Sequence, residues 1–217
     1  MITDLLIDWN GTLLDDLQVC VDGINKVLSS RNLPLLDNDR YRNIFTFPVK
    51  DYYEAAGLDF DHETFEVPAM EFMDFYIQKI KDAALFQDTK EVLTGLKSRG
   101  YNLWLASAME QELLDRLTTH FGVSVYFNEI WGIDDHYASG KEAMIAGRIK
   151  EKGITPAQTC LIGDTLHDAE VAKSLGLECI LIDRGHQSAQ RLSESGFRVV
   201  GSLTEAGMLL NGKNKTD

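Results

Sequence analysis

Short apolar runs alternate with segments of helical periodicity from Asp88 onward, and this alternation constrains the fold more than any other feature of the sequence. The apolar runs predict strands at 103–106, 127–131, 160–162, 179–182 and 199–201. The segments around them predict helices at 88–100, 109–120, 139–153, 166–175 and 203–210. Strands that alternate with helices of this length form a parallel sheet with helices on both faces. We therefore predict an α/β fold with a three-layer core.

Residues 16–83 show a different pattern. Apolar residues recur at helical spacing in 17–28 and again in 72–80, and no convincing strand pattern lies between these stretches. We therefore expect an α-helical domain inserted at residues 16–83, while residues 1–15 and 84–217 form the core. The aromatic residues of the insertion are expected to pack in its interior rather than to stack on a ligand.

A carboxylate stands where the first strand ends. The apolar run 5–7 is followed by Asp8, and then by Gly11 and Thr12 in a turn. Gly11 permits a tight turn, and Thr12 can hydrogen-bond the turning backbone. Because ligands bind at the carboxyl ends of strands in an open α/β sheet, Asp8 is a candidate nucleophile or metal ligand. A surface acid before an ordinary Asn-Gly turn would give the same pattern.

Polar residues also follow two later strands and begin a later helix. Ser107 follows the strand at 103–106, Lys141 begins the helix at 139–153, and Asp164 and Asp168 follow the strand at 160–162. Asp8 and Asp164 could share one hard cation, and a helix N-terminus with a hydroxyl residue can bind phosphate. With the positive charge of Lys141, this set is suited to phosphoryl transfer through a carboxylate.

Each of these positions also has a structural explanation. The segments Ser107–Glu110 and Thr165–Asp168 both match the capping-box pattern, which stabilises the start of a helix without any catalysis. Lys141 could be one more solvated lysine. Only the combination of these residues, in this order along the chain, favours a site.

The composition restricts the partners. The chain has 217 residues and a formal net charge of −13, with no basic cluster, so we expect neither a nucleic acid nor an anionic membrane as partner. An anionic substrate then requires a local reversal of the field, which a bound divalent cation provides. Cys20, Cys160 and Cys179 are expected to be buried thiols, and we expect a cytoplasmic monomer or homodimer with no membrane-spanning segment.

The motifs together resemble those of the haloacid dehalogenase superfamily over nearly the whole chain. The first motif, Asp-x-Asp-Gly-Thr-x-x-Asp, is matched by Asp8–Asp15 except at its third position. The second is Ser107, the third is Lys141, and the fourth, Gly-Asp-x-x-x-Asp, is Gly163–Asp168. The insertion lies where phosphoglycolate-phosphatase-like members carry a helical cap. The resemblance implies a Rossmann-like core with such a cap.

The resemblance also implies a nucleophile and a metal. Asp8 would attack phosphorus and become an aspartyl phosphate. Mg²⁺ would be held by Asp8, Asp164 and the backbone carbonyl of Asn10. Asp168 would order the water around the metal or pair with Lys141.

Phosphate binding is implied at a second group of residues. Ser107 and Lys141 would bind the oxygens of the transferred phosphoryl group. Gly11, Thr12 and Ala108 would assist, chiefly through backbone N–H groups in their neighbourhood. The cap would close over the substrate and exclude water.

Asn10 departs from the family pattern. Most phosphatases of the family have an aspartate there, which protonates the leaving group, and the loss of such an acid costs about 10²–10⁴-fold in rate. The protein could be a slow phosphatase or one selective for good leaving groups. It could also use another proton carrier, and the nearest candidates in the sequence are Asp15, Asp16 and His167.

A different reaction is a further alternative. Phosphonoacetaldehyde hydrolases of the superfamily also lack that aspartate and use a cap lysine as a Schiff base, and Lys50 occupies a comparable position. We favour an anchoring role for Lys50 on the substrate's distal anion, with a plain surface lysine comparable and Arg42 a weaker anchor. A non-catalytic member that binds metal or phosphate as a regulator also stays open. The sequence favours a Mg²⁺-dependent phosphatase of a small phosphorylated metabolite.

Overall fold

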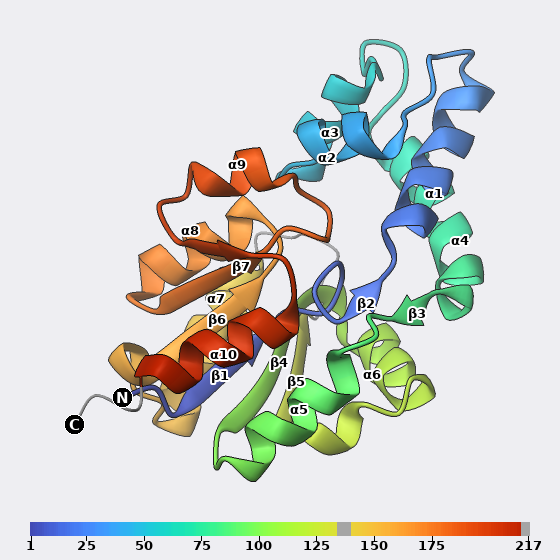
Figure 1. The fold of residues 1–217 in the computed structure, drawn as a ribbon. Coiled ribbons are helices and arrows are strands. Elements are labelled where there is room, and N and C mark those ends of the chain that lie inside the picture. Colours follow the sequence, from blue (N-terminus) through green and yellow to red (C-terminus); the bar gives the residue numbers. More distant parts are fainter. Residues whose placement is uncertain (134–139, 214–217) are drawn as a thin grey trace.

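The computed structural model describes residues 1–133 and 140–213. Its main sheet has six parallel strands in the order β5-β4-β1-β6-β7-β8 (Figure 1). These strands are Asp4–Ile7 (β1), Asn102–Glu110 (β4), Glu129–Ile133 (β5), Thr159–Gly163 (β6), Glu178–Ile182 (β7) and Arg198–Val200 (β8). The predicted α/β fold with a parallel sheet is confirmed.

Side chains alternate between the two faces of this sheet and so build two cores. In β1, Leu5 and Ile7 face one core and Leu6 faces the other, as the two-residue period of a strand requires. The first core is covered by α5 (Thr89–Ser98), α6 (Gln111–His120) and α10 (Leu203–Lys213). The second is covered by α7 (Gly140–Lys152) and α8 (Leu166–Leu175), and the short α9 (Ala189–Ser193) follows β7. The chain therefore has the expected three layers.

A helical insertion lies between β1 and β4, and we call its helices α1–α4 the cap. They are Leu17–Ser30 (α1), Asn38–Ile44 (α2), Val49–Ala56 (α3) and Glu66–Lys79 (α4). The cap stands beside the core in Figure 1, joined to it through the antiparallel pair β2 (Leu14–Asp15) and β3 (Ala84–Leu85). This pair lies at the expected boundaries after residue 15 and before residue 84, which stay a prediction.

The largest differences from the expected boundaries lie around β4, β5 and α6. The strand predicted at 127–131 is β5, two residues later, and the helix predicted from 109 begins at Gln111 because β4 continues to Glu110. The carboxylate of Glu110 accepts hydrogen bonds from the backbone N–H of Glu112 and of Leu113, both at 2.9 Å. Glu110 therefore caps α6, and the predicted capping box that begins at Ser107 is wrong.

The second predicted capping box is confirmed. The Asp168 carboxylate accepts hydrogen bonds from the backbone N–H of Thr165 at 3.1 Å and from its hydroxyl at 2.7 Å, at the start of α8. The predicted start of the helix at 139–153 lies partly outside the described residues, since Ser139 is not among them. The described helix α7 begins at Gly140.

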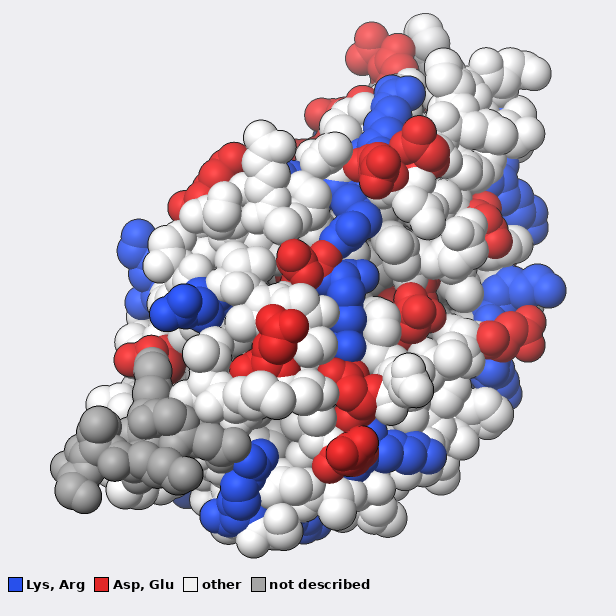
Figure 2. Space-filling model, in the orientation of Figure 1, with Lys and Arg blue, Asp and Glu red and all other residues white. Residues whose placement is uncertain are grey.

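The net charge of −13 is divided between the surface and the interior, where several aspartates are buried. On the face shown in Figure 2, acidic and basic side chains are interspersed. Cys20, Cys160 and Cys179 are buried thiols, as expected. Within the ranges that the structure describes, no helix is both long and apolar enough to cross a membrane.

Replacement of a core leucine tests the central strand. We expect Leu6→Ala to lower the free energy of unfolding by about 2–5 kcal/mol, because Leu6 is fully buried in the core that α7 and α8 cover and the change leaves a cavity. Leu35→Ala is the matched control, since Leu35 is 58% exposed, and it should cost less than about 0.5 kcal/mol. Urea unfolding measures both, and equal losses in the two variants would contradict the assignment of the core.

Candidate active site

The carboxyl ends of three neighbouring strands bring together the polar residues that the sequence singles out. Asp8 follows β1, Ser107 lies near the end of β4, and Asp164 follows β6, the other neighbour of β1. Lys141 and Asp168 reach the same place from α7 and α8. All five are buried, and Asp8, the most exposed of them, retains 8% of its surface.

Lys141 joins two of these carboxylates. Its ammonium nitrogen lies 2.6 Å from Oδ1 of Asp8 and 2.7 Å from Oδ1 of Asp168. Burial alone would lower the pKa of Lys141, but the two carboxylates outweigh burial and raise it. Burial would likewise raise the pKa of Asp168, but the charge of Lys141 holds it below the usual value. Lys141 is therefore a permanent buried cation.

The charge at this place is nevertheless negative. Asp8, Asp164 and Asp168 each offer a carboxylate oxygen, and these oxygens all lie within 4.8 Å of one another. Burial raises the pKa of Asp8 to about 6, against the charge of Lys141, and that of Asp164 to about 7, against the charge of His186. Three carboxylates with one ammonium group leave a net charge that a hard divalent cation would balance. The donor set therefore fits a metal ion with a preference for oxygen.

The turn after β1, residues 9–12, packs against the carboxylate of Asp164. Gly11 has a φ of 66°, and a Cβ at this position would lie 2.2 Å from Oδ2 of Asp164, so only glycine fits. Its N–H, expected among the phosphate donors, is instead bonded to Leu14 O at 2.9 Å and to Oδ1 of Asp16 at 3.0 Å. The Thr12 hydroxyl donates to Oδ1 of Asp164 at 3.4 Å rather than to the turn.

The end of β4 supplies two further expected residues. The Ser107 hydroxyl oxygen accepts a hydrogen bond from the backbone N–H of Met109 at 3.1 Å. Ala108, between them, is half-buried in the same irregular part of the strand, where the pairing with β5 shifts register between Ala106 and Glu110.

Asn10 is held by the beginning of the cap. Its amide nitrogen donates to Oδ2 of Asp16 at 2.7 Å and lies 2.6 Å from the hydroxyl of Tyr76 in α4. Tyr76 in turn donates to the same oxygen of Asp16 at 3.0 Å. Burial would raise the pKa of Asp16, but the charge of His186 and hydrogen bonds from His186, Asn10 and Tyr76 hold it below the usual value. Asn10 thus faces an ionised carboxylate.

His186 is the functional-site candidate that the sequence analysis missed. It is 4% exposed, and its Nε2 lies 3.1 Å from Oδ1 of Asp16. Its Nδ1 lies 3.0 Å from the hydroxyl of Tyr41 in α2, and its backbone N–H donates to Oδ2 of Asp164 at 2.5 Å. Burial alone would lower the pKa of His186, but the Asp16 carboxylate raises it to about 9. The rule that ligands bind at strand ends, applied to β7, could have found it.

The other candidate proton carriers differ in their surroundings. His167 packs on Phe47 of the cap, with 4.9 Å between ring centroids, and its buried Nε2 has no hydrogen-bond partner among the described residues. Asp15 is exposed in β2, and we call the pair β2 and β3, which joins the cap to the core, the hinge. Asp16 contacts Asn10 directly.

The two candidate anchors lie away from the carboxylates. The side chain of Lys50 is 53% exposed, 3.8 Å from Glu54 and 5.6 Å from the centroid of Phe60. The guanidinium group of Arg42 donates to the backbone carbonyls of Asp183 and Gln187. Arg42 therefore links α2 of the cap to the loop that follows β7 in the core.

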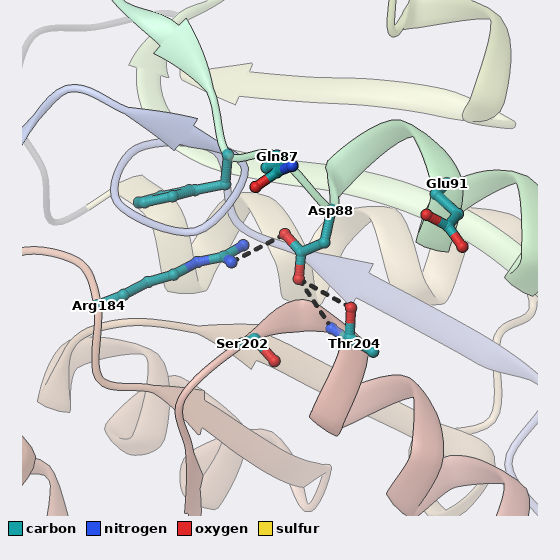
Figure 3. Close-up of a pocket in the computed structure, with 7 residues that line it drawn as sticks. Gln87, Asp88, Glu91, Arg184, Ser202 and Thr204 are labelled. Carbon is teal, nitrogen blue, oxygen red and sulfur yellow. Dashed lines mark hydrogen bonds and ion pairs between the residues drawn. The ribbon is translucent and has the colours of Figure 1, made fainter.

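A separate hollow of about 430 Å³ lies beside the hinge (Figure 3). Arg184 is 2.8 Å from Asp88 there, and Asp88 also accepts hydrogen bonds from the backbone N–H and the hydroxyl of Thr204. The guanidinium group also stacks on Phe86, 3.9 Å from its centroid. Because the Arg184 guanidinium group is paired with Asp88 and stacked on Phe86, we assign this contact a structural role.

Known proteins resemble this chain in sequence. It is 28% identical over 185 residues to a protein named phosphoglycolate phosphatase from Caulobacter vibrioides, covering 82% of this chain and 78% of that one. It is 24% identical over 196 residues to a protein named 5'-nucleotidase from Pseudomonas aeruginosa, covering 87% and 86%.

The fold is shared more widely than the sequence. A haloacid dehalogenase-like family hydrolase from Streptococcus pneumoniae superimposes with a TM-score of 0.84 at 20% identity, covering 96% of this chain and 98% of that one. The family model described as haloacid dehalogenase-like hydrolase matches residues 5–182, from β1 to the end of β7. Since this match spans most of the sequence, the chain belongs to the haloacid dehalogenase-like hydrolases.

Proposed function

We propose that this protein is a Mg²⁺-dependent phosphatase that hydrolyses a small phosphorylated metabolite through an aspartyl phosphate on Asp8. The observation that carries the proposal is the buried contact of Lys141 with Asp8 and Asp168, next to Asp164. A purely structural ion pair would not need the additional buried carboxylate of Asp164, which has no cationic side chain of its own within hydrogen-bond distance among the described residues.

In the first step, a carboxylate oxygen of Asp8 attacks phosphorus and the bond from phosphorus to the leaving oxygen breaks. Lys141 orients the attacking carboxylate and offsets the charge of the phosphoryl oxygens, while Ser107 binds one of them. In the second step, water hydrolyses the aspartyl phosphate and releases inorganic phosphate, which regenerates Asp8. Mg²⁺, held by Asp8, Asp164 and the carbonyl of Asn10 with Asp168 close by, would supply charge neutralisation.

The class of substrate is inferred by analogy with the named relatives. The relative from Caulobacter vibrioides is named phosphoglycolate phosphatase, and phosphoglycolate is therefore the first substrate to test. Since the relatives carry different names, and fold does not fix the substrate, the proposal stays at the class of small phosphorylated metabolites.

The phosphonoacetaldehyde alternative gains no support from the position of Lys50. A lysine that forms an imine near neutral pH needs a lowered pKa, which burial away from water provides. Lys50 is more than half exposed and lies near a carboxylate, so its surroundings offer no such burial. The surface position also weakens the anchoring role.

Loss of the nucleophile tests the proposed reaction. We expect wild type to hydrolyse p-nitrophenyl phosphate only with Mg²⁺, and Asp8→Asn to lower kcat by at least about 10³-fold, because an amide cannot form the acyl phosphate. Steady-state kinetics with and without EDTA measure this. Asp22→Asn, a change of an exposed acid in α1, is the control. Equal turnover by wild type and Asp8→Asn would contradict the proposal.

Exchange of Asn10 and Asp16 tests leaving-group protonation. The double variant Asn10→Asp, Asp16→Asn keeps one amide and one carboxylate at this contact, whereas Asn10→Asp alone opposes two carboxylates. We expect the exchange to raise kcat/KM for an alkyl phosphate by about 10²-fold and to change that for p-nitrophenyl phosphate little, because only a poor leaving group needs a general acid. If the ratio of the kcat/KM values for the alkyl phosphate and p-nitrophenyl phosphate stays unchanged, position 10 does not lie next to the leaving group.

Replacement of Asp164 tests the link between charge and stability. The pKa values of Asp8 and Asp164 in the folded chain, about 6 and about 7, exceed the ordinary value of 3.8. Folding therefore binds protons, and the stability that these groups contribute is complete below pH 4 and is lost as the pH rises through 6–7.

We accordingly expect Asp164→Asn to raise the free energy of unfolding at pH 7.5 in EDTA by about 1–3 kcal/mol and to flatten its decline between pH 5 and 7. The same variant should lose the stabilisation that Mg²⁺ gives to wild type. Urea unfolding in EDTA and in Mg²⁺ measures both effects. Destabilisation in EDTA at pH 7.5 would show that the charge of Asp164 is already compensated within the chain.

A further inference from the structure

The loop between β7 and α9, residues 183–188, lies against both the carboxylates and the cap. A Cβ at Gly185 would lie 2.1 Å from Oδ2 of Asp164 and 2.5 Å from the carbonyl oxygen of Gly11. The backbone of the loop is therefore in direct contact with a candidate metal ligand and with the turn after Asp8. Any shift of this loop must move the Asp164 carboxylate or separate from it.

His186 connects that carboxylate to two parts of the cap. Its backbone N–H binds Oδ2 of Asp164, while its ring lies 3.1 Å from Oδ1 of Asp16 and 3.0 Å from the hydroxyl of Tyr41. Asp16 directly precedes α1, and Tyr41 lies in α2. One buried residue thus makes polar contacts with the core site and with two cap elements.

The core holds this loop firmly on the side that faces the hinge. Arg184 is 2.8 Å from Asp88 (Figure 3). It also donates to the carbonyl oxygen of Thr12 at 3.2 Å. Gln187 accepts a hydrogen bond from the backbone N–H of Leu166 at 2.7 Å. Because these contacts fix the loop to the core, an opening of the cap has to break the contacts of the loop with the cap instead.

Those contacts with the cap run along α2. Arg42 donates to two carbonyls of the loop, Gln187 donates to the carbonyl of Phe45 at 2.8 Å, and Ser188 donates to Asn43 at 2.9 Å. Of the loop residues that bond the cap, His186 is the one that also bonds a candidate metal ligand among the described residues.

We propose that His186 is a positioning residue that couples closure of the cap to cation binding at Asp164. The inference rests on the proposed function, because it takes Asp164 as a ligand of Mg²⁺. With the cap closed, Asp16 and Tyr41 hold the ring, and the ring holds the backbone N–H against Asp164. Without these contacts, the carboxylate loses a fixed donor and its orientation. Since such coupling is reciprocal, Mg²⁺ binding favours the closed cap to the same extent.

The first measurement is the affinity for Mg²⁺ alone, by isothermal titration calorimetry on the full chain. We expect His186→Ala to weaken binding about 10–100-fold, as loss of a residue that orients a metal ligand does. Tyr41→Phe removes one hydroxyl from the cap and touches no carboxylate of the site, yet it should weaken Mg²⁺ binding in the same direction. His186→Gln, which keeps a polar donor on the side chain, should recover part of the affinity. His62→Ala changes an exposed cap histidine and is the control.

The second measurement is hydrogen exchange of backbone amides in α2. In wild type and in His62→Ala, Mg²⁺ should slow this exchange. In His186→Ala and Tyr41→Phe, Mg²⁺ should no longer slow exchange in α2. Exchange in β1 and β6 should stay slow in both variants, which shows that the core remains folded. A merely structural role of His186 would speed exchange throughout the chain and would leave the response of α2 to Mg²⁺ intact.

The outcomes separate this inference from the proposed function. Wild-type affinity for Mg²⁺ in Tyr41→Phe and in folded His186→Ala would overturn the coupling and leave the phosphatase proposal standing. If His186→Ala does not fold, Tyr41→Phe decides. No binding of Mg²⁺ to wild type would overturn both proposals together.

Discussion

The ammonium group of Lys141, buried between Asp8 and Asp168, is the interaction on which the site depends. Each buried carboxylate loses several kcal/mol of hydration, which only a close opposite charge and further hydrogen bonds offset. Lys141 satisfies two of the three carboxylates, and it links the start of α7 to Asp8 after β1 and to Asp168 in α8. The remaining carboxylate, Asp164, accepts hydrogen bonds from the His186 backbone and the Thr12 hydroxyl but from no cationic side chain in the described part of the chain, and burial keeps its pKa high against the charge of His186. The same arrangement that makes the folded chain less stable near neutral pH therefore prepares it to bind a divalent cation.

On the side of the site that faces the cap, Asp16 joins several groups in the way that Lys141 joins the carboxylates of the core. Its buried carboxylate accepts hydrogen bonds from Asn10, Gly11 and Tyr76, lies 3.1 Å from His186 and contacts the thiol of Cys20. An aspartate in place of Asn10 would bring a second negative charge to within hydrogen-bond distance of this carboxylate. Asn10 is thus explained by its neighbour, and the departure from the family motif is compensated within the structure. Asn10 therefore joins the turn after β1 to Asp16 and to Tyr76 of α4, and its amide cannot act as a proton donor to the leaving group.

Residues close to strand ends could be predicted from the sequence, and residues that act through long-range contacts could not. Asp8, Ser107 and Asp164 each follow an apolar run that the sequence predicts to be a strand of one parallel sheet. Their proximity at the carboxyl ends of these strands therefore follows from the fold. The contact of Asp16 with His186 joins positions 170 apart in the chain, and no periodicity or spacing marks it. The start of α6 was misplaced because a carboxylate at Glu110 supplies the cap, and the hydroxyl of Ser107 matched the same pattern three residues too early.

The positions of Asp16 and Tyr41 give the contacts of His186 different roles in a motion of the cap. Asp16 directly follows β2, one of the two hinge strands, whereas Tyr41 lies in α2, which Figure 1 shows beside α9 and away from β2 and β3. In a rotation about the hinge, displacement grows with distance from the axis, so Tyr41 moves farther than Asp16. The hydrogen bond with Tyr41 therefore breaks first, and the ring, although still beside Asp16 near the axis, loses one of the two contacts that fix its orientation. An opening of this kind separates α2 from the loop and loosens His186, whose backbone N–H binds Asp164, while the charge of its ring keeps its partner.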